Sequence, residues 1–380
     1  MSSKVLLDPE RRSPEFMEFE TDLRRRVVGQ DRAVRRVSHI FQVVQTGMNT
    51  VGRPQGSFLF LGPTGTGKTH VVEAAAEILF GNPRAFIKVD CAEFQQGHEI
   101  AKLVGSPPGY LGHRETPSML SQKALDEHHT QDRQFGFILF DEVEKAHDAL
   151  WKLLLGILDK GTLTLGDNKK VDFSKTVVFM TSNLGSKEIG QLISGKIGFQ
   201  NKATDDSQSL DQSIYRTAMG VARRNFSPEF MNRIDKVVVF RTLSRKHLRQ
   251  IIDLELRTVQ ERIVARESGT PFVLECTDRA KDFLLDQGWD PAYGARHLRR
   301  AIERYLVFPL SSLMATRQVR AGDIVSVDVS DDAGKLMFLR EPMFRAAPRG
   351  ADALVGLNEM VVQADYCPIP SAGGLRTEAR

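Results

Sequence analysis

The feature that most constrains this chain is a glycine-rich loop between an apolar run and a helical pattern. The loop reads Gly62-Pro63-Thr64-Gly65-Thr66-Gly67-Lys68-Thr69 and fits the pattern GxxxxGK[ST] in full. Residues 57–61 before it predict a buried strand, and residues 70–80 after it predict a helix with one apolar face. A strand, this loop and a helix predict a phosphate-binding site, because the glycines let successive backbone N–H groups point into one concavity.

All eight residues of this loop are candidate nucleotide contacts. The helix that follows adds the positive end of its dipole, which favours bound anions. We expect the Lys68 ammonium to meet the outer phosphates and the Thr69 hydroxyl to ligate Mg²⁺. The cofactors expected are therefore ATP and Mg²⁺.

Two carboxylates follow a second apolar run. Residues 137–140 read Phe-Ile-Leu-Phe, and Asp141 and Glu142 come next. Ligands of open α/β sheets bind at the carboxyl ends of the strands, so we expect both side chains beside the loop. Asp141 would hold Mg²⁺, directly or through water, and Glu142 would polarise the water that attacks the γ-phosphate.

The pattern along the chain predicts an α/β fold followed by a smaller domain. Five short apolar runs, separated by helical patterns, predict a parallel sheet with helices on both faces: residues 57–61, 85–89, 135–140, 176–180 and 236–240. We expect one long helix over 142–160 and an exposed insertion over 182–225, where glycines recur. Gly166-Asp167-Asn168 predicts a hairpin turn.

The remainder of the chain predicts a second, mainly helical domain that ends in a small β pair. Ser244 and Thr277 are expected to cap helices that end near residues 267 and 287. A third helix is expected over 294–316, and strands over 323–329 and 335–339. The expected organisation is a leader (1–26), a large ATPase domain (27–240), a small α+β domain (241–340) and a tail (341–380).

Composition excludes several classes of protein. Hydrophobic residues make up 41% and charged residues 26% of the 380 residues, which excludes a mostly disordered chain. No run of 18 apolar residues is present, and the first twelve residues carry charges where a signal peptide needs an apolar stretch. The three cysteines are far apart, without a CxxC pair, so neither a disulfide scaffold nor a thiolate zinc site is expected. We expect a reduced, cytoplasmic protein without a membrane partner.

The order of these motifs resembles the C-terminal ATPase module of the Clp family of AAA+ protein unfoldases (ClpA, ClpB and ClpC). The similarity runs from about residue 27 to about residue 339. Residues 140–147 read Phe-Asp-Glu-Val-Glu-Lys-Ala-His, which is nearly the family's own string, and residues 181–183 read Thr-Ser-Asn at the position of sensor one. Residues 225–235 resemble the segment with the arginine finger, and Gly294-Ala295-Arg296 resembles sensor two.

The resemblance implies roles for individual residues. Val27 and Val28 would pack against adenine, as part of a Val-Val-Gly-Gln segment that ends at residue 30. Asn183 would help place the attacking water. Arg233 would act as the arginine finger on a neighbouring subunit's γ-phosphate, which requires a ring of subunits. Arg296 would couple the small domain to the nucleotide.

The resemblance also implies contacts with other proteins. Tyr110 and Leu111, within Ser-Pro-Pro-Gly-Tyr-Leu-Gly (106–112), resemble the loop that grips an unfolded chain in the ring pore. The following residues 113–118 depart from the family's glycine-containing continuation, and residues 161–173 resemble a second pore loop. Ile197-Gly198-Phe199 resembles the tripeptide by which ClpA, ClpC and ClpX dock on the ClpP peptidase, although such a loop could instead fold back on its own domain.

The sequence therefore predicts an ATP-dependent unfoldase that threads polypeptide through a ring, expected as a single-ring homo-hexamer. It would act on unfolded or tagged proteins, as the ATPase subunit of a Clp-type protease or as a free-standing chaperone. No GxSxG or HExxH motif indicates a peptidase within the chain. One alternative is an AAA+ ATPase acting on nucleic acid through the arginines between residues 11 and 36, although no nucleic-acid module is seen. Another is a regulatory ATPase that does not thread.

Overall fold

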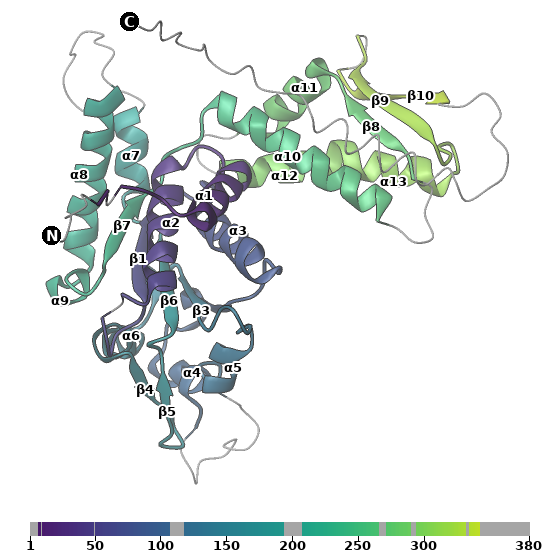
Figure 1. Cartoon of the computed structure of the whole chain (residues 1–380). Coiled ribbons are helices and arrows are strands. Elements are labelled where there is room, and N and C mark those ends of the chain that lie inside the picture. Colours follow the sequence, from purple (N-terminus) through teal and green to yellow (C-terminus); the bar gives the residue numbers. More distant parts are fainter. Residues whose placement is uncertain are drawn as a thin grey trace, which may run out of the picture. The chain divides into compact units, whose positions relative to one another are not determined.

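The computed structural model describes residues 7–8, 10–48, 50–106, 118–193, 207–265, 271–289, 294–331 and 334–342 (Figure 1). By its contacts the chain divides into two compact units. The first is Met1–Leu254 with Gly288–Arg300, and the second is Glu255–Gln287 with Ala301–Arg380. Within the described residues, no helix is both long and apolar enough to cross a membrane.

The first unit is built on a five-stranded sheet in which every pairing is parallel. Its strands lie in the order β2 (Ile87–Asp90), β3 (Gly136–Asp141), β6 (Thr176–Ser182), β1 (Gly56–Leu61) and β7 (Lys236–Val239). The three central strands β3, β6 and β1 are buried almost throughout, as expected where helices cover both faces. The expected parallel sheet is confirmed.

Successive side chains of the three central strands enter two different cores. Phe58 and Phe60 of β1 face one core together with Phe179 of β6, while Leu59 and Leu61 face the other. Helices α1 (Pro14–Arg26), α2 (Asp31–Thr46) and α3 (Lys68–Phe80) close the first core. Helices α6 (Asp148–Lys160), α7 (Ser186–Ile193) and α8 (Ser207–Asn225) close the second.

Short elements complete the described part of this unit. They are η1 (Cys91–Glu93), η2 (Gly97–Ile100), α4 (Ala101–Val104), α5 (Gln122–Asp126), η3 (Val143–Lys145), β4 (Thr162–Thr164), β5 (Lys170–Asp172) and α9 (Pro228–Met231). Strands β4 and β5 pair antiparallel, so the hairpin expected at residues 166–168 is confirmed. Asn168 has a positive φ of 64°, which asparagine tolerates better than most residues.

Two sequence expectations for this unit are wrong. The long helix expected from residue 142 begins only at Asp148, because Ala146 and His147 have extended backbones (ψ 146° and 154°) that separate it from the short 3₁₀ helix η3. The insertion expected over 182–225 is largely helical in its described residues. Ile214 and Ala218, one helical turn apart on α8, are buried in the core, and the scattered glycines and serines hide this spacing in the sequence.

Residues 14–26, which the sequence places in a leader, form helix α1. Ser13 caps its start, because the Ser13 hydroxyl accepts a 3.1 Å hydrogen bond from the Phe16 N–H. Phe16, Phe19 and Leu23 follow a helical spacing and are buried. Figure 1 shows α1 beside α2 and α3, and the three helices share one core.

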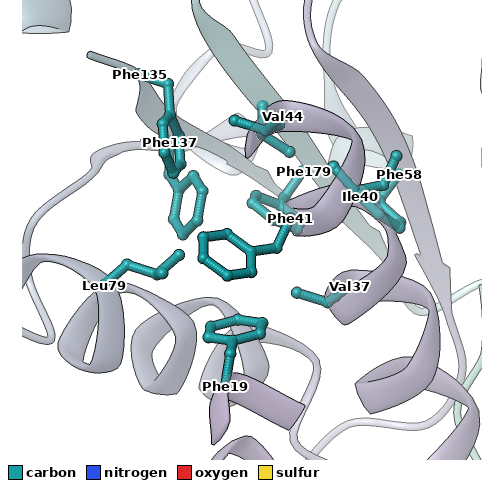
Figure 2. Close-up of a pocket in the computed structure, with 11 residues that line it drawn as sticks. Phe19, Val37, Ile40, Phe41, Val44, Phe58, Leu79, Phe135, Phe137 and Phe179 are labelled. Carbon is teal, nitrogen blue, oxygen red and sulfur yellow. The ribbon is translucent and has the colours of Figure 1, made fainter. Parts of the chain in front are cut away.

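A small apolar cavity lies where α1, α2 and α3 meet the sheet. Figure 2 shows the aromatic rings that surround it, among them Phe19, Phe41 and Phe137. The rings of Phe19 and Phe41 are 4.6 Å apart between centroids. The cavity measures about 10 Å³, and its lining has almost no polar surface, so we expect it to be dry.

Replacing Phe41 by Ala should destabilise this unit by about 3–5 kcal/mol, because a buried ring is lost beside an existing cavity. The matched control is Val43→Ala on the same helix, since Val43 is exposed and its loss should change stability by no more than about 0.5 kcal/mol. Urea denaturation followed by circular dichroism measures both variants. Equal midpoints for the two would contradict the packing described here.

The second unit combines helices with a three-stranded sheet. Its elements are the end of α10 (Arg245–Val264), β8 (Val273–Cys276), α11 (Asp278–Gly288), the end of α12 (Ala295–Ile302), the π-helix η4 (Glu303–Val307), α13 (Phe308–Ala315), β9 (Asp323–Val329) and β10 (Leu336–Pro342). β9 pairs antiparallel with β10 and parallel with β8. The smaller, mainly helical domain is confirmed. The sequence missed β8, which has four residues, and the π turn within the helix expected over 294–316.

Candidate nucleotide-binding site

The register of the parallel strands brings three predicted site segments to one edge of the sheet. Leu61, the last residue of β1, pairs with Ser182 of β6 and with Val239 of β7. Phe140 of β3 pairs with Met180 of β6. The loop after β1, the carboxylates after β3 and Asn183 after β6 therefore meet, as the sequence predicts from strand ends alone.

The loop over residues 62–69 needs its glycines for geometric reasons. Gly62, Gly65 and Gly67 have φ values of 145°, 76° and 95°, a region that other residues avoid. A Cβ on Gly62 would also lie 2.6 Å from the carbonyl oxygen of Phe240, so only glycine fits there. Helix α3 begins at Lys68, which places its positive dipole end at the loop.

Lys68 is buried inside this loop. Its Nζ donates hydrogen bonds to the carbonyl oxygens of Gly62 (2.7 Å) and Pro63 (2.9 Å) and to Oδ1 of Asn183 (2.8 Å). Burial lowers the pKa of Lys68 to about 8, against the opposing effect of nearby carboxylates. A buried ammonium group attracts an anion more strongly than an exposed one, because less water screens its charge.

Asp141 lies among oxygen and nitrogen donors from two strands and the loop. The Thr69 hydroxyl is 3.5 Å from both oxygens of Asp141. The Thr181 hydroxyl donates a short hydrogen bond to Oδ1, and Lys88 Nζ is 3.1 Å from Oδ2. Residues of β6 and β2 thus orient the Asp141 carboxylate toward the Thr69 hydroxyl, the other Mg²⁺ ligand that the sequence predicts.

Glu142 is held by its backbone and by both of its carboxylate oxygens. Its N–H donates to the Thr181 hydroxyl (3.0 Å), which stabilises the left-handed conformation at this residue. Oε1 accepts from Nδ2 of Asn183 (3.1 Å), and Oε2 is 2.5 Å from Lys145 Nζ. The hydrogen bond with Glu142 raises the pKa of Lys145.

Asn183 connects Lys68 to Glu142. Its Oδ1 accepts from Lys68 and its Nδ2 donates to Glu142, so one amide spans the loop and the carboxylate. Its backbone N–H donates to Oε1 of Glu144 (3.0 Å). The other oxygen of Glu144 is buried without a hydrogen-bond partner, a costly arrangement in this crowded set of charges.

The segment before α2 is tied to the same loop through Gln30. The Gln30 amide donates to the carbonyl oxygens of Thr66 (3.1 Å) and Arg241 (3.0 Å) and accepts from the Arg241 N–H (3.3 Å). Val27, three residues earlier, is buried, and Val28 is half-buried. These bonds fix the predicted adenine segment to the phosphate loop and to the end of β7.

The start of α12 also contacts the loop. The Ala295 N–H donates to the carbonyl oxygen of Gly65 (3.1 Å). Arg296 follows immediately, and its positive charge contributes to the lowered pKa of Lys68, whose main cause is burial. The predicted sensor-two residue therefore lies beside the phosphate loop.

Two known protein families match long segments of this chain. Residues 53–237 match the AAA domain (Cdc48 subfamily), and residues 243–327 match the C-terminal D2-small domain of ClpB protein. The chain belongs to the Clp-type AAA family. Membership of this family implies nucleotide binding.

Relatives in this family are longer than the chain. Chaperone protein ClpB 1 of Thermosynechococcus vestitus is 36% identical over 332 residues, which is 87% of this chain and 35% of the relative. Chaperone protein ClpC, chloroplastic, of Pisum sativum is 37% identical over 330 residues, or 86% and 34%. An extended S. cerevisiae Hsp104:casein complex has a TM-score of 0.71 and 32% identity, and the match covers 87% of this chain and 53% of that one. The Clp-type AAA chain spans about a third of the length of these curated relatives.

Arg233 lies at the opposite edge of the sheet from the other site residues. Its carbonyl oxygen accepts from the Ser57 hydroxyl (3.1 Å), near the start of β1, whereas the phosphate loop follows the end of β1. Four residues of strand separate Ser57 from Leu61, or about 13 Å. Arg233 Nε is 3.4 Å from Oδ1 of Asp159, and Arg233 Nη1 is 2.8 Å from Oε1 of Glu229. Hydrogen bonds with these two carboxylates raise the pKa of Arg233.

Two groups of predicted residues lie outside the described part of the chain. They are Tyr110 and Leu111 of the predicted pore loop and Ile197, Gly198 and Phe199 of the predicted docking tripeptide. The second predicted pore loop, in contrast, is the described hairpin of β4 and β5.

Four residues of the Clp-type AAA site were given no role by the sequence reasoning: Gln30, Lys88, Glu144 and Thr181. Gln30, Glu144 and Thr181 lie within the segments that resemble the Clp family (27–30, 140–147 and 181–183). The sequence therefore indicates their position near the site but not their hydrogen-bond partners. Lys88 had a weaker signal, which is a charged residue inside a predicted strand of the sheet.

The residues present fit a bound ATP with Mg²⁺. The loop offers a buried ammonium, backbone groups at a helix start and a glycine, Gly62, whose added Cβ would collide with the Phe240 carbonyl oxygen. Thr69 and Asp141 supply the hard oxygen ligands that Mg²⁺ prefers. Among the described residues, no group of three or more His, Cys, Asp or Glu is arranged as a metal site by itself.

Proposed function

We propose that the chain is the ATP-hydrolysing part of a protein unfoldase or remodelling chaperone that works as a ring. The observation that carries this proposal is the Asn183 amide, which joins buried Lys68 to Glu142 at the edge where Asp141 and the phosphate loop meet. This arrangement supports roles for Lys68 as a phosphate-binding cation and for Glu142 as a carboxylate base, on either side of one polar side chain.

Each residue has a chemical task in this proposal. Lys68 and the loop amides bind and orient the phosphates, and Thr69 and Asp141 would hold Mg²⁺. Bound Mg²⁺ would offset the negative charge that the transferred phosphoryl group carries. Glu142 accepts a proton from water at a carboxylate oxygen, while Asn183 fixes that carboxylate in place. Val27 and Val28 would pack against the base.

Arg233 supports a ring rather than a monomer. It lies about one strand length from the phosphate loop of its own chain, so we propose that it serves the site of a neighbouring copy. Head-to-tail contacts of this kind form rings where the rotation between neighbouring subunits closes. We propose a homo-hexamer, as the family resemblance implies, with Arg296 linking the small domain to the nucleotide.

We propose polypeptide as the substrate, threaded past Tyr110 and Leu111. Support comes from the family and from the solved Hsp104 structure, which is an Hsp104:casein complex. ClpP-type docking through Ile197, Gly198 and Phe199 and a cytoplasmic location belong to the same proposal. No observation on the described residues favours nucleic acid as an alternative substrate.

The test is ATP-dependent unfolding of a folded fluorescent protein that carries an unstructured tail. We expect fluorescence loss with ATP, and loss of that activity with continued ATP hydrolysis when Tyr110 is replaced by Ala. Unfolding that survives Tyr110→Ala would contradict threading. With a ClpP peptidase added, replacing Ile197 and Phe199 by Ala should abolish degradation but not unfolding. Degradation that persists in that variant would contradict the docking role.

A further inference from the structure

Gly294 lies where no side chain fits. Its φ is +55°, and a Cβ built on it would lie 2.7 Å from the carbonyl oxygen of Gly65 and 3.0 Å from its carbonyl carbon. Real Cβ atoms do not approach backbone atoms this closely, and backbone cannot swing aside as a flexible side chain can. The glycine therefore permits direct contact between two main chains that are far apart in the sequence.

The contact fixes one peptide group of the phosphate loop. The Ala295 N–H donates to the Gly65 carbonyl oxygen, and in a trans peptide the following N–H, that of Thr66, points the opposite way. The next carbonyl, of Thr66, accepts from the buried Gln30 amide. Two consecutive peptides of the loop are thus held by segments from different parts of the chain, and phosphate loops bind anions through such oriented N–H groups.

We infer that Gly294 is a positioning residue for nucleotide binding. It lets the segment that carries Arg296 dock on the phosphate loop, and the docked main chain sets the orientation of the Gly65–Thr66 peptide. The inference rests on the proposed function, because it assumes that the loop binds the phosphates of a nucleotide. It goes beyond that function by making the loop's shape depend on whether the start of α12 is docked.

The chain offers a matched control for the positive φ of this glycine. Gly81, at the end of α3, has a φ of +73°, and a Cβ there would meet nothing within 4 Å. Gly81→Ala and Gly294→Ala therefore carry a similar cost in backbone strain. Only Gly294→Ala should push the Ala295 N–H away from Gly65.

The docking is tested first by hydrogen exchange in the nucleotide-free protein. We expect the Ala295 amide to exchange at least about tenfold faster in Gly294→Ala than in the wild type or in Gly81→Ala, because its hydrogen bond is lost. Unchanged exchange in Gly294→Ala would overturn the docking role. This measurement does not depend on whether the chain binds ATP, so a chain without nucleotide affinity would contradict the proposed function while the docking contact could still be shown.

The link to the nucleotide is tested by titrating a fluorescent ADP analogue. We expect Gly294→Ala to weaken binding about tenfold, within the usual range of coupling between contacts, and Gly81→Ala to leave it close to the wild type. Arg296→Ala should also weaken binding. The loss of binding free energy in the double variant should be smaller than the sum of the losses in the two single variants, because both changes act through one docked segment. Full additivity, or wild-type affinity in Gly294→Ala, would overturn the inference.

Discussion

Replacing Glu142 by Gln should slow ATP hydrolysis by about 10²–10⁴-fold while ATP binding persists, because the base is lost and the phosphate contacts remain. Glutamine keeps an oxygen that can accept from Asn183 Nδ2 and nearly the same shape. It loses only the ion pair with Lys145, which is partly exposed and worth no more than about 1 kcal/mol. The measurement is steady-state phosphate release together with an equilibrium titration of nucleotide.

The control for this variant is Glu127→Gln, the same chemical change at an exposed glutamate after α5. It should hydrolyse ATP at the wild-type rate. If Glu142→Gln also retained the wild-type rate, the base would have to be another group, and the assignment built on the Asn183 bridge would be wrong.

Replacing Arg233 by Ala should lower the rate of ATP hydrolysis about 10³-fold or more. An arginine that acts on the phosphate of a neighbouring subunit typically accelerates hydrolysis by about 10³–10⁵-fold. The sharper result is expected from a mixture. A ring made of Arg233→Ala and Glu142→Gln subunits contains interfaces where an intact Glu142 faces an intact Arg233. An equal mixture of the two inactive variants should recover about a quarter of the wild-type rate, from random pairing at each head-to-tail interface.

Arg53→Ala is the matched control for this experiment, because Arg53 shares the Asp159 carboxylate with Arg233. The rate of ATP hydrolysis of Arg53→Ala should stay close to that of the wild type, since exposed ion pairs contribute little to stability. A mixture as inactive as its components, with intact oligomers by light scattering, would show that Arg233 does not act on a neighbouring site.

Local patterns in the sequence were enough to predict the loop over 62–69, Asp141 and Glu142. A glycine loop between a strand and a helix, and carboxylates after a buried strand, define their surroundings within a few residues. Thr181 and Lys88 act on Asp141 only because β6 and β2 flank β3, which is a matter of strand order and register. No local pattern contains that order.

The errors have a related cause. The helix expected from residue 142 has the right apolar spacing, but the sequence does not show that residues 146 and 147 are extended, with the His147 N–H donating to the Phe94 carbonyl oxygen of a distant segment. Likewise, the glycines of residues 182–225 are typical of loops, and only the packing of α7 and α8 against the core shows that this segment is helical. In both cases a tertiary contact overrides the local preference.

Helix α1 has a consequence for anyone who shortens this chain. A protein that starts at Val27 would retain all eight residues of the phosphate loop, yet it would lack Phe19, which packs on Phe41 and walls the cavity of Figure 2. The uncovered face of α2 and α3 would be apolar, and such faces drive non-specific self-association. Particles formed by a shortened protein would therefore say little about ring assembly, and tags belong before Ser13 rather than in place of the helix.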